Sequence, residues 1–182
     1  MGAVQPARTL RKLWKRLGHA CGSGRVCIQD LETVLAEARR SAEVTHNHPE
    51  GIKGAQATAA AVFLARKKTS KHEIHSYIEA TFGYNLDQKL AAIRPDYRFD
   101  ETCQGTVPAA PLSFLESNDF EDAIRNAVSL GGDSDTLACI AGSVAHAYYG
   151  GIPAVIQQEA LNRLDAYLRK VIEEFGVVYL PG

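Results

Sequence analysis

The most informative part of the sequence is Gly131-Gly132-Asp133-Ser134-Asp135-Thr136, followed by Leu137-Ala138-Cys139-Ile140-Ala141-Gly142. It predicts a helix of small residues whose first turn carries two carboxylates and a hydroxyl. Such oxygen ligands suit Mg²⁺ or Mn²⁺ better than Zn²⁺, because they are hard donors and no Cys or His sits beside them. Asp and Ser at a helix start also cap exposed N–H groups, and without further context capping is the commoner interpretation.

The residues that follow this stretch favour metal binding over simple helix capping. From Asp133 to Tyr149 the chain resembles the GGDTDT-type element of the ADP-ribosylglycohydrolase family, and residues 145–153 resemble its continuation. In that family Asp-x-Asp-Thr supplies half of a two-metal site. The resemblance therefore implies that Asp133, Asp135 and Thr136 bind Mg²⁺ or Mn²⁺, and that the backbone at Gly132 helps to hold the substrate.

Residues 40–57 resemble the family's central Ser-Ala-x-x-Thr-His element, which implies that His46 lines the ADP-ribose pocket. Without the resemblance, His46-x-His48 is either a metal-binding pair or a polar loop before Pro49, and the loop is commoner because no further ligands are positioned by the sequence.

Residues 101–116 resemble the family's Cys-x-Gly-Ser-Val-Pro element. Gly105 would let the backbone approach a ligand closely, and Val107-Pro108 is expected to start the next helix. The alternative is an ordinary Gly-Thr-x-Pro loop before a helix.

Hydrophobic periodicity predicts a compact all-α protein. The family resemblance further implies an orthogonal helical bundle that is truncated at its N-terminal side. The region around Ala55 and Ala59 is rich in alanine, so the helix there is expected to be buried against close neighbours. The expected helices span residues 30–43, 50–68, 70–81, 86–92, 107–116, 119–128, 134–149 and 154–175.

Composition sets outer limits on function. The 182 residues are 46% hydrophobic with a formal net charge of −1, which fits one globular domain with no global attraction to nucleic acid or an anionic membrane. Four cysteines without CxxC spacing indicate a cytoplasmic location.

The sequence His72-Glu73-Ile74-His75 is not a zinc-protease motif, because its histidines are three apart rather than four, and both are expected at exposed helix positions.

The family's second acidic element, Thr-Asp-Asp-Thr, is absent from the chain, and residues 1–28 match nothing expected of the family. Codons that encode residues 12–29 can be chosen so that, one base later, they read SYGNGSAMRVGPVGFAF, which contains the family's Gly-Asn-Gly-Ser-Ala-Met-Arg-Val loop. Our hypothesis is that residues 1–28 come from a displaced reading frame, while residues 29–182 form the C-terminal part of the family domain. We expect the first segment to be irregular or loosely attached.

The resemblance implies metal-dependent hydrolysis of the ribose C1″ glycosidic bond, with release of ADP-ribose from modified protein or small acceptors. With half of the ligands absent, we expect this chain to be incomplete and weakly active or inactive. The alternative is a non-catalytic ADP-ribose-binding module or a crystallin-like scaffold. Exposed apolar helix faces would also favour self-association.

Overall fold

The computed structural model describes residues 30–100 and 102–179, and the predicted boundary after residue 28 lies outside this range. Within the described residues all regular structure is helical and there is no strand, so the predicted all-α class is confirmed. The chain divides into a larger unit, Leu31–Pro153, and a second unit whose described helices follow Pro153. No helix in the described part is long and apolar enough to cross a membrane.

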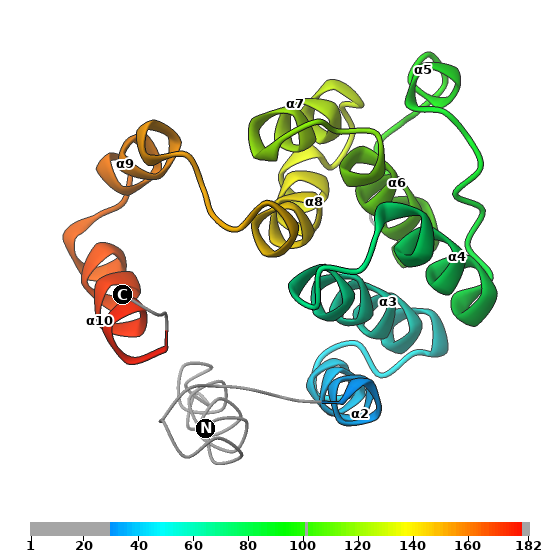
Figure 1. Ribbon diagram of the computed structural model, residues 1–182, viewed down its shortest axis with the longest axis horizontal. Helices are drawn as coiled ribbons and strands as arrows, with labels where there is room; N and C mark the ends of the chain where they lie inside the picture. Colours follow the sequence, from blue (N-terminus) through cyan, green and yellow to red (C-terminus); the bar gives the residue numbers. More distant parts are fainter. Residues whose placement is uncertain (1–29, 101, 180–182) are drawn as a thin grey trace, which may run out of the picture. The chain divides into compact units, whose positions relative to one another are not determined.

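The larger unit is built from seven described helices (Figure 1). They are α2 (Leu31–Ala42), α3 (Pro49–Arg66), α4 (Lys71–Phe82), α5 (Leu90–Ile93), α6 (Cys103–Leu115), α7 (Phe120–Ser129) and α8 (Ser134–Tyr149).

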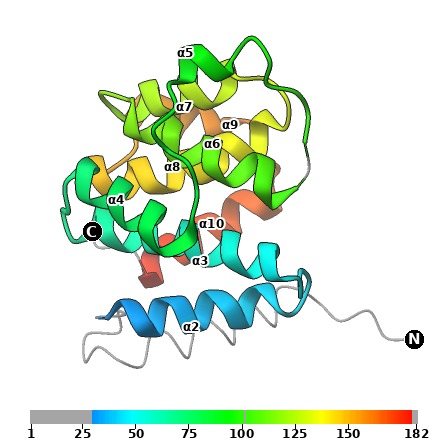
Figure 2. The ribbon, with the colours of Figure 1, turned by 90° about the vertical axis from the view of Figure 1, so that its right-hand side faces the viewer.

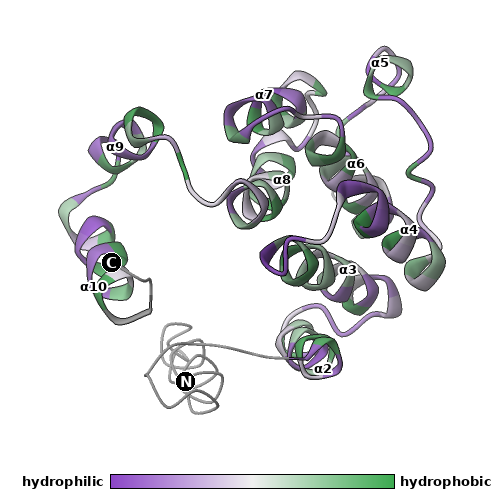
Figure 3. Cartoon of the chain, in the orientation of Figure 1, coloured by the Kyte–Doolittle hydropathy of each residue, from purple (hydrophilic) through white to green (hydrophobic). Residues whose placement is uncertain are grey.

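Three helices, α3, α6 and α8, contact one another in every pair and form the centre of this unit. Helix α7 covers α6 and α8, while α2 and α4 each lie against α3, as Figure 2 shows from the side. Figure 3 shows hydrophobic segments on α3, α6 and α8 beside more polar ones. Close approach depends on small side chains, and four alanines of α3 are fully buried, as the sequence predicted for this helix: Ala57, Ala60, Ala61 and Ala65.

The predicted start of α6 at Val107-Pro108 is wrong, because the helix begins one turn earlier at Cys103. The Thr102 hydroxyl caps it by accepting a hydrogen bond from the Gly105 N–H at 3.2 Å. Pro108 and Pro111 consequently lie inside the helix. Proline has no N–H to donate to the preceding turn, so two intrahelical hydrogen bonds are missing from α6.

Two other predicted helices differ from the structure. In place of the helix expected over residues 86–92 the structure has only the short α5, Leu90–Ile93, and the Leu86 N–H donates to Glu79 Oε1 at 2.7 Å. The single helix expected over 154–175 is two helices, α9 (Ala154–Asn162) and α10 (Ala166–Tyr179). Asp165 causes the break, since its Oδ1 accepts from the Leu168 N–H at 2.8 Å and so caps α10.

Helix α10 carries several exposed apolar side chains. Tyr167, Leu168, Val171 and Ile172 are each at least 46% exposed. These residues give α10 an apolar surface, which is the kind of feature on which the expected self-association depends.

Candidate functional site

A cleft of about 600 Å³ opens in the larger unit where the α2–α3 turn, the start of α6 and the start of α8 meet. Its walls come from stretches up to about 100 residues apart in the sequence. The residues that line it are Ser41, Ala42, Thr45, His46, Gly51, Gly54, Ala55, Thr58, Ala59, Thr102, Cys103, Thr106, Val107, Asp133, Thr136 and Ile140. Each of the three motifs singled out in the sequence therefore contributes side chains to one cavity.

The turn between α2 and α3 presents Thr45 and His46 to the cleft. The Thr45 hydroxyl and His46 Nδ1 share a hydrogen bond of 2.8 Å, and both side chains are exposed. A Cβ at Gly51 would lie 2.8 Å from the His46 carbonyl oxygen, so only glycine lets the first turn of α3 pass this close to the turn. His48 is occupied otherwise, because its Nδ1 accepts from the Glu50 N–H and caps α3. This supports the loop interpretation of His46-x-His48.

At the start of α8, Asp133 occupies the N-cap position but its side chain makes no capping hydrogen bond. Its carboxyl group faces that of Asp135 instead. A hydrogen bond with the Asp133 side chain, together with the N–H groups of Asp135 and Thr136, lowers the pKa of Asp135 below its ordinary value of 3.8. When both carboxyl groups are ionised they repel each other, and a bound cation removes that repulsion. The simple capping interpretation of the sequence therefore does not describe Asp133.

Gly105 and Gly132 lie beside the segment that precedes α6. The position of a Cβ at Gly105 is filled by the Asp100 carboxylate, and a Cβ at Gly132 would lie 3.1 Å from both the Arg98 carbonyl oxygen and Tyr97 Cε1. Gly132 also has a φ of +63°, which glycine adopts without strain. The close neighbours of both glycines are thus parts of this chain. Whether their backbones also approach a substrate stays a prediction.

Asp100 is a residue that the sequence analysis missed. Its Oδ1 accepts from the Thr102 N–H at 2.7 Å, and its backbone oxygen accepts from the Thr106 hydroxyl at 2.7 Å. The hydrogen bonds with Thr102 lower the pKa of the Asp100 carboxyl. Burial, followed by the charges of Asp100 and Asp133, raises the pKa of Tyr97, whose hydroxyl donates to the Gly105 carbonyl oxygen at 3.3 Å. These bonds join the segment before α6 to the first turn of that helix.

Tyr84 was missed as well. It is 6% exposed, and burial, with the nearby Glu50 and Cys103, raises the pKa of Tyr84 to about 12. Its hydroxyl has no hydrogen-bond partner, and Lys53 Nζ lies 4.4 Å from the centre of its ring. A single tyrosine after a glycine gives no signal in the sequence that it will pack beside the cleft wall.

The structure brings together some of the predicted site residues. His46, Asp133 and Thr136 line the cleft, and Asp135 contacts Asp133 from the same helical turn. The donor set of two adjacent carboxylates and a hydroxyl, with one carboxylate free of helix capping, fits a hard divalent cation. It supplies three of the roughly six oxygen ligands that Mg²⁺ takes.

Comparison with known proteins gives one consistent result. The model of the ADP-ribosylglycohydrolase family matches residues 18–180. The chain is 32% identical over 124 residues to the ADP-ribosylarginine hydrolase Tri1 of Pseudomonas putida, covering 64% of this chain and 33% of that protein. It is 28% identical over 166 residues to the ADP-ribosylhydrolase ARH3 of Gallus gallus, covering 66% and 45%.

A solved structure of an ADP-ribosylglycohydrolase-related protein complex matches with a TM-score of 0.58 and 30% identity, covering 80% of this chain and 52% of that one. An uncharacterized protein of Archaeoglobus fulgidus is 28% identical over 164 residues, covering 77% and 54%. The chain thus spans about a third to a half of the length of the relatives it matches.

Proposed function

Because the chain belongs to the ADP-ribosylglycohydrolase family, we propose that it acts on ADP-ribosylated substrates by hydrolysing the glycosidic bond at ribose C1″. The products are ADP-ribose and the free acceptor. The single observation that carries this proposal is the shared cleft, to which His46, Asp133 and Thr136 contribute from distant parts of the sequence.

In this proposal Asp133, Asp135 and Thr136 hold Mg²⁺ or Mn²⁺ through oxygen atoms. When bound, such an ion supplies positive charge that orients ribose hydroxyls and acidifies a water molecule. His46 contacts the ADP-ribose, and its exposed ring, oriented by the bond to Thr45, is available to do so. The backbone at Gly132, just before the N-terminus of α8, provides an N–H group for the diphosphate. The Gly105 N–H is already bonded to the Thr102 hydroxyl, so Gly105 contributes only its lack of a side chain.

We further propose that turnover by this chain is weak. Asp133, Asp135 and Thr136 supply at most half of the oxygen ligands of a two-metal site, and the sequence has no Thr-Asp-Asp-Thr element to supply the rest. Mg²⁺ keeps its water molecules unless the site is nearly octahedral, so half a ligand set binds it weakly.

The test is to measure ADP-ribose release from ADP-ribosylated arginine and serine substrates with Mg²⁺ or Mn²⁺. We expect slow release that the Asp133→Asn variant abolishes. Robust turnover by the wild-type chain would contradict the weak-activity proposal. Slow release that Asp133→Asn leaves unchanged would contradict the assignment of the metal ligands.

A second candidate function is ADP-ribose binding without hydrolysis, or a crystallin-like structural role, and the half ligand set favours it. Calorimetry separates these outcomes: ADP-ribose binding without release supports a binding module, whereas neither binding nor release supports a scaffold.

Two further predictions concern the oligomeric state of the chain and its location in the cell. Sedimentation would test self-association, which a monodisperse monomer contradicts, and cell fractionation would test a cytoplasmic location.

A further inference from the structure

A second cleft, of about 530 Å³, lies between α4, the segment that follows it and the end of α6, and the proposed function does not use it. It is lined by Lys71, His72, His75, Ser76, Glu79, Asp87 and Leu115. Within the described residues, His75, Glu79 and Asp87 are the one group of three His, Cys, Asp or Glu side chains close enough to share a metal ion. One ligand atom from each lies within 4.8 Å of the others.

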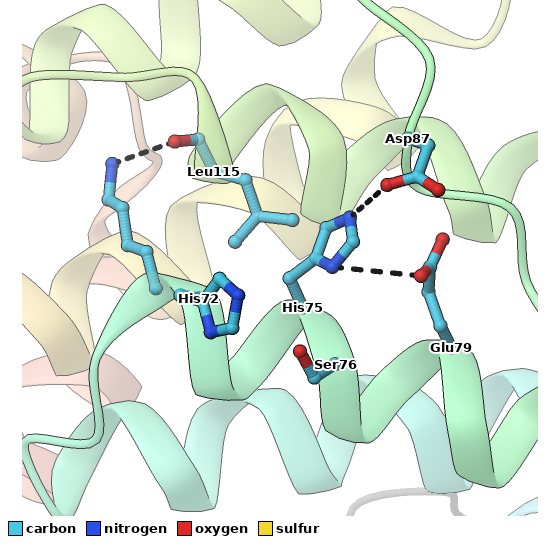
Figure 4. A pocket seen from close by; sticks show the side chains of 7 residues that line it. His72, His75, Ser76, Glu79, Asp87 and Leu115 are labelled. Carbon is cyan, nitrogen blue, oxygen red and sulfur yellow. Dashed lines mark hydrogen bonds and ion pairs between the residues drawn. The ribbon is translucent and has the colours of Figure 1, made fainter.

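Figure 4 shows the His75 ring held between the two carboxylates. His75 Nδ1 lies 3.7 Å from Glu79 Oε2, and Nε2 lies 3.4 Å from Asp87 Oδ1. A neutral imidazole has only one N–H, so one of its two nitrogens then presents a lone pair to a carboxylate oxygen. That contact is repulsive. A cation between the nitrogen and the oxygen removes the repulsion.

The chain positions these three side chains by different means. His75 and Glu79 are four residues apart on α4, so they lie on the same face of the helix. Glu79 is further oriented, because its Oε1 accepts from the Leu86 N–H at 2.7 Å while Oε2 points toward His75. Such a bond to the second oxygen is how proteins fix ligating carboxylates. Gly83, with a φ of +66°, ends α4 and turns the chain back toward Asp87.

The two contacts use opposite ring nitrogens, so an ion bound to His75 Nε2 requires the Glu79 carboxylate to turn from Nδ1 toward it. One ligand atom from each of the three side chains lies within 4.8 Å of the others, so this adjustment is short. Bonds of about 2.0 Å in a tetrahedral zinc site place neighbouring ligand atoms roughly 3.3 Å apart. The distance between His75 Nε2 and Asp87 Oδ1 is already 3.4 Å. The Asp87 side chain is 84% exposed on a connecting segment, so it can move closer without disturbing the core.

We propose that His75, Glu79 and Asp87 bind a divalent transition-metal ion such as Zn²⁺, which joins the segment after α4 to the helix. Imidazole nitrogen selects transition metals over Mg²⁺, which prefers oxygen. Three protein ligands leave a fourth position open to water in the cleft. This site is independent of the proposed hydrolase function and contains none of its residues.

The experiment measures Zn²⁺ affinity of the full chain by equilibrium dialysis, together with the thermal unfolding midpoint in the presence and absence of Zn²⁺. The variants are His75→Gln, Glu79→Gln and Asp87→Asn. Glu79→Gln keeps an oxygen for the Leu86 N–H and removes only the charge. His72→Gln is the matched control, because His72 lines the same cleft one turn earlier but is outside the group of three.

We expect each of the three variants to lose Zn²⁺ affinity by at least about tenfold and to lose the rise in unfolding midpoint that Zn²⁺ gives the wild-type chain. His72→Gln should keep both. Unchanged affinity in all three variants would overturn the proposal and leave His75 as an imidazolium ion paired with two carboxylates. Equal affinity for Zn²⁺ and Mg²⁺ would overturn it too. Comparing several variants protects the test against one of them failing to fold.

Discussion

The N-termini of α4 and α8 carry similar polar residues but use them differently. At α4, Ser70 and Glu73 form a complete capping box: Ser70 Oγ accepts from the Glu73 N–H at 3.3 Å, and Glu73 Oε2 accepts from the Ser70 N–H at 3.0 Å. At α8, the Asp133 side chain makes no capping bond and meets Asp135 instead. The first helix start is thus capped by its own side chains, whereas at the second the Asp133 carboxylate makes no capping bond and lies at the edge of a cleft.

The difference separates residues that stabilise the fold from residues that are available for binding. A helix start with unused capping capacity forgoes about 1 kcal/mol. Such a local loss at α8, next to a cavity of about 600 Å³, supports a functional role for Asp133. Four variants test this comparison.

The largest effect is expected for Asp133→Ala. We expect Mn²⁺ affinity to fall by about 100-fold because one carboxylate ligand is removed. The free energy of unfolding should change by less than about 0.5 kcal/mol, since no capping bond is lost. Calorimetry and urea unfolding measure the two quantities.

The matched control for Asp133→Ala is Asp119→Ala. Asp119 occupies the same position before α7, but its Oδ1 accepts from the Asp122 N–H at 2.8 Å. This variant should lose about 1 kcal/mol of stability and keep its Mn²⁺ affinity. If the two variants behave alike, the distinction between capping and binding at these helix starts is wrong.

The next effect is expected for Lys71→Met, which tests whether a residue of the second cleft is structural. Lys71 Nζ donates to the Phe114 and Leu115 carbonyl oxygens at 2.9 and 3.1 Å and also to that of Ser117. It lies 4.8 Å from the centre of the Phe114 ring. Removing a cation that satisfies the end of α6 should cost about 2 kcal/mol of unfolding free energy.

Zn²⁺ affinity should be unchanged or higher in Lys71→Met, because a positive charge has left the cleft. The control is Lys170→Met, whose Nζ pairs at 3.8 Å with an exposed Glu174 and should change stability by less than about 0.5 kcal/mol. A weaker Zn²⁺ affinity in Lys71→Met would mean that Lys71 helps to hold the metal ligands in place.

A smaller effect is expected for Gly51→Ala, which tests the wall of the first cleft. The new Cβ would lie 2.8 Å from the His46 backbone oxygen, so the turn must move. We expect a loss of about 1.5 kcal/mol, although alanine favours a helix, together with weaker ADP-ribose binding. Gly151→Ala is the control, because nothing lies within 4 Å of its Cβ position. Unimpaired ADP-ribose binding by Gly51→Ala would show that His46 does not contribute to ADP-ribose binding.

The sequence was sufficient to predict features that depend on local signals. The predicted range 134–149 agrees with α8, and Gly150 ends this helix with a φ of +87°. The start of α6 was not predictable from Pro108, since the Thr102 cap that overrides it looks like any other threonine. A local signal therefore predicts a helix end only where no second signal nearby favours a different end.

The candidate sites depend on contacts between residues far apart in the sequence, and these contacts limit how much of each site can be predicted. That His46 and Asp133 would line one cleft was predicted from the family resemblance, and no local pattern in the sequence requires it. His75 was expected at an exposed position, but its side chain is only 22% exposed because Asp87 and Glu79 flank it. The i,i+4 spacing of His75 and Glu79 was visible in the sequence. Asp87 comes close to His75 because the chain turns at Gly83 in a left-handed conformation. The direction in which the chain leaves this turn cannot be deduced from the sequence.

The smallest effect is expected for Ser70→Ala at α4, where the comparison predicts a change in stability without any change in ligand binding. Hydrogen bonds from the Ser70 hydroxyl and, to a smaller extent, from the Ser70 backbone N–H lower the pKa of Glu73 below its ordinary value of 4.5. Because the pKa of Glu73 is lower in the folded state than in the unfolded state, the ionised carboxylate stabilises the fold at pH values above the unfolded-state pKa. This stabilisation is lost as the pH falls through the folded-state pKa. Ser70→Ala should therefore destabilise the chain more at neutral pH than at acid pH, as measured by urea unfolding at both pH values. Its Mn²⁺ affinity should equal that of the wild-type chain, and a cost independent of pH would show that the Glu73 carboxylate does not take part in the cap.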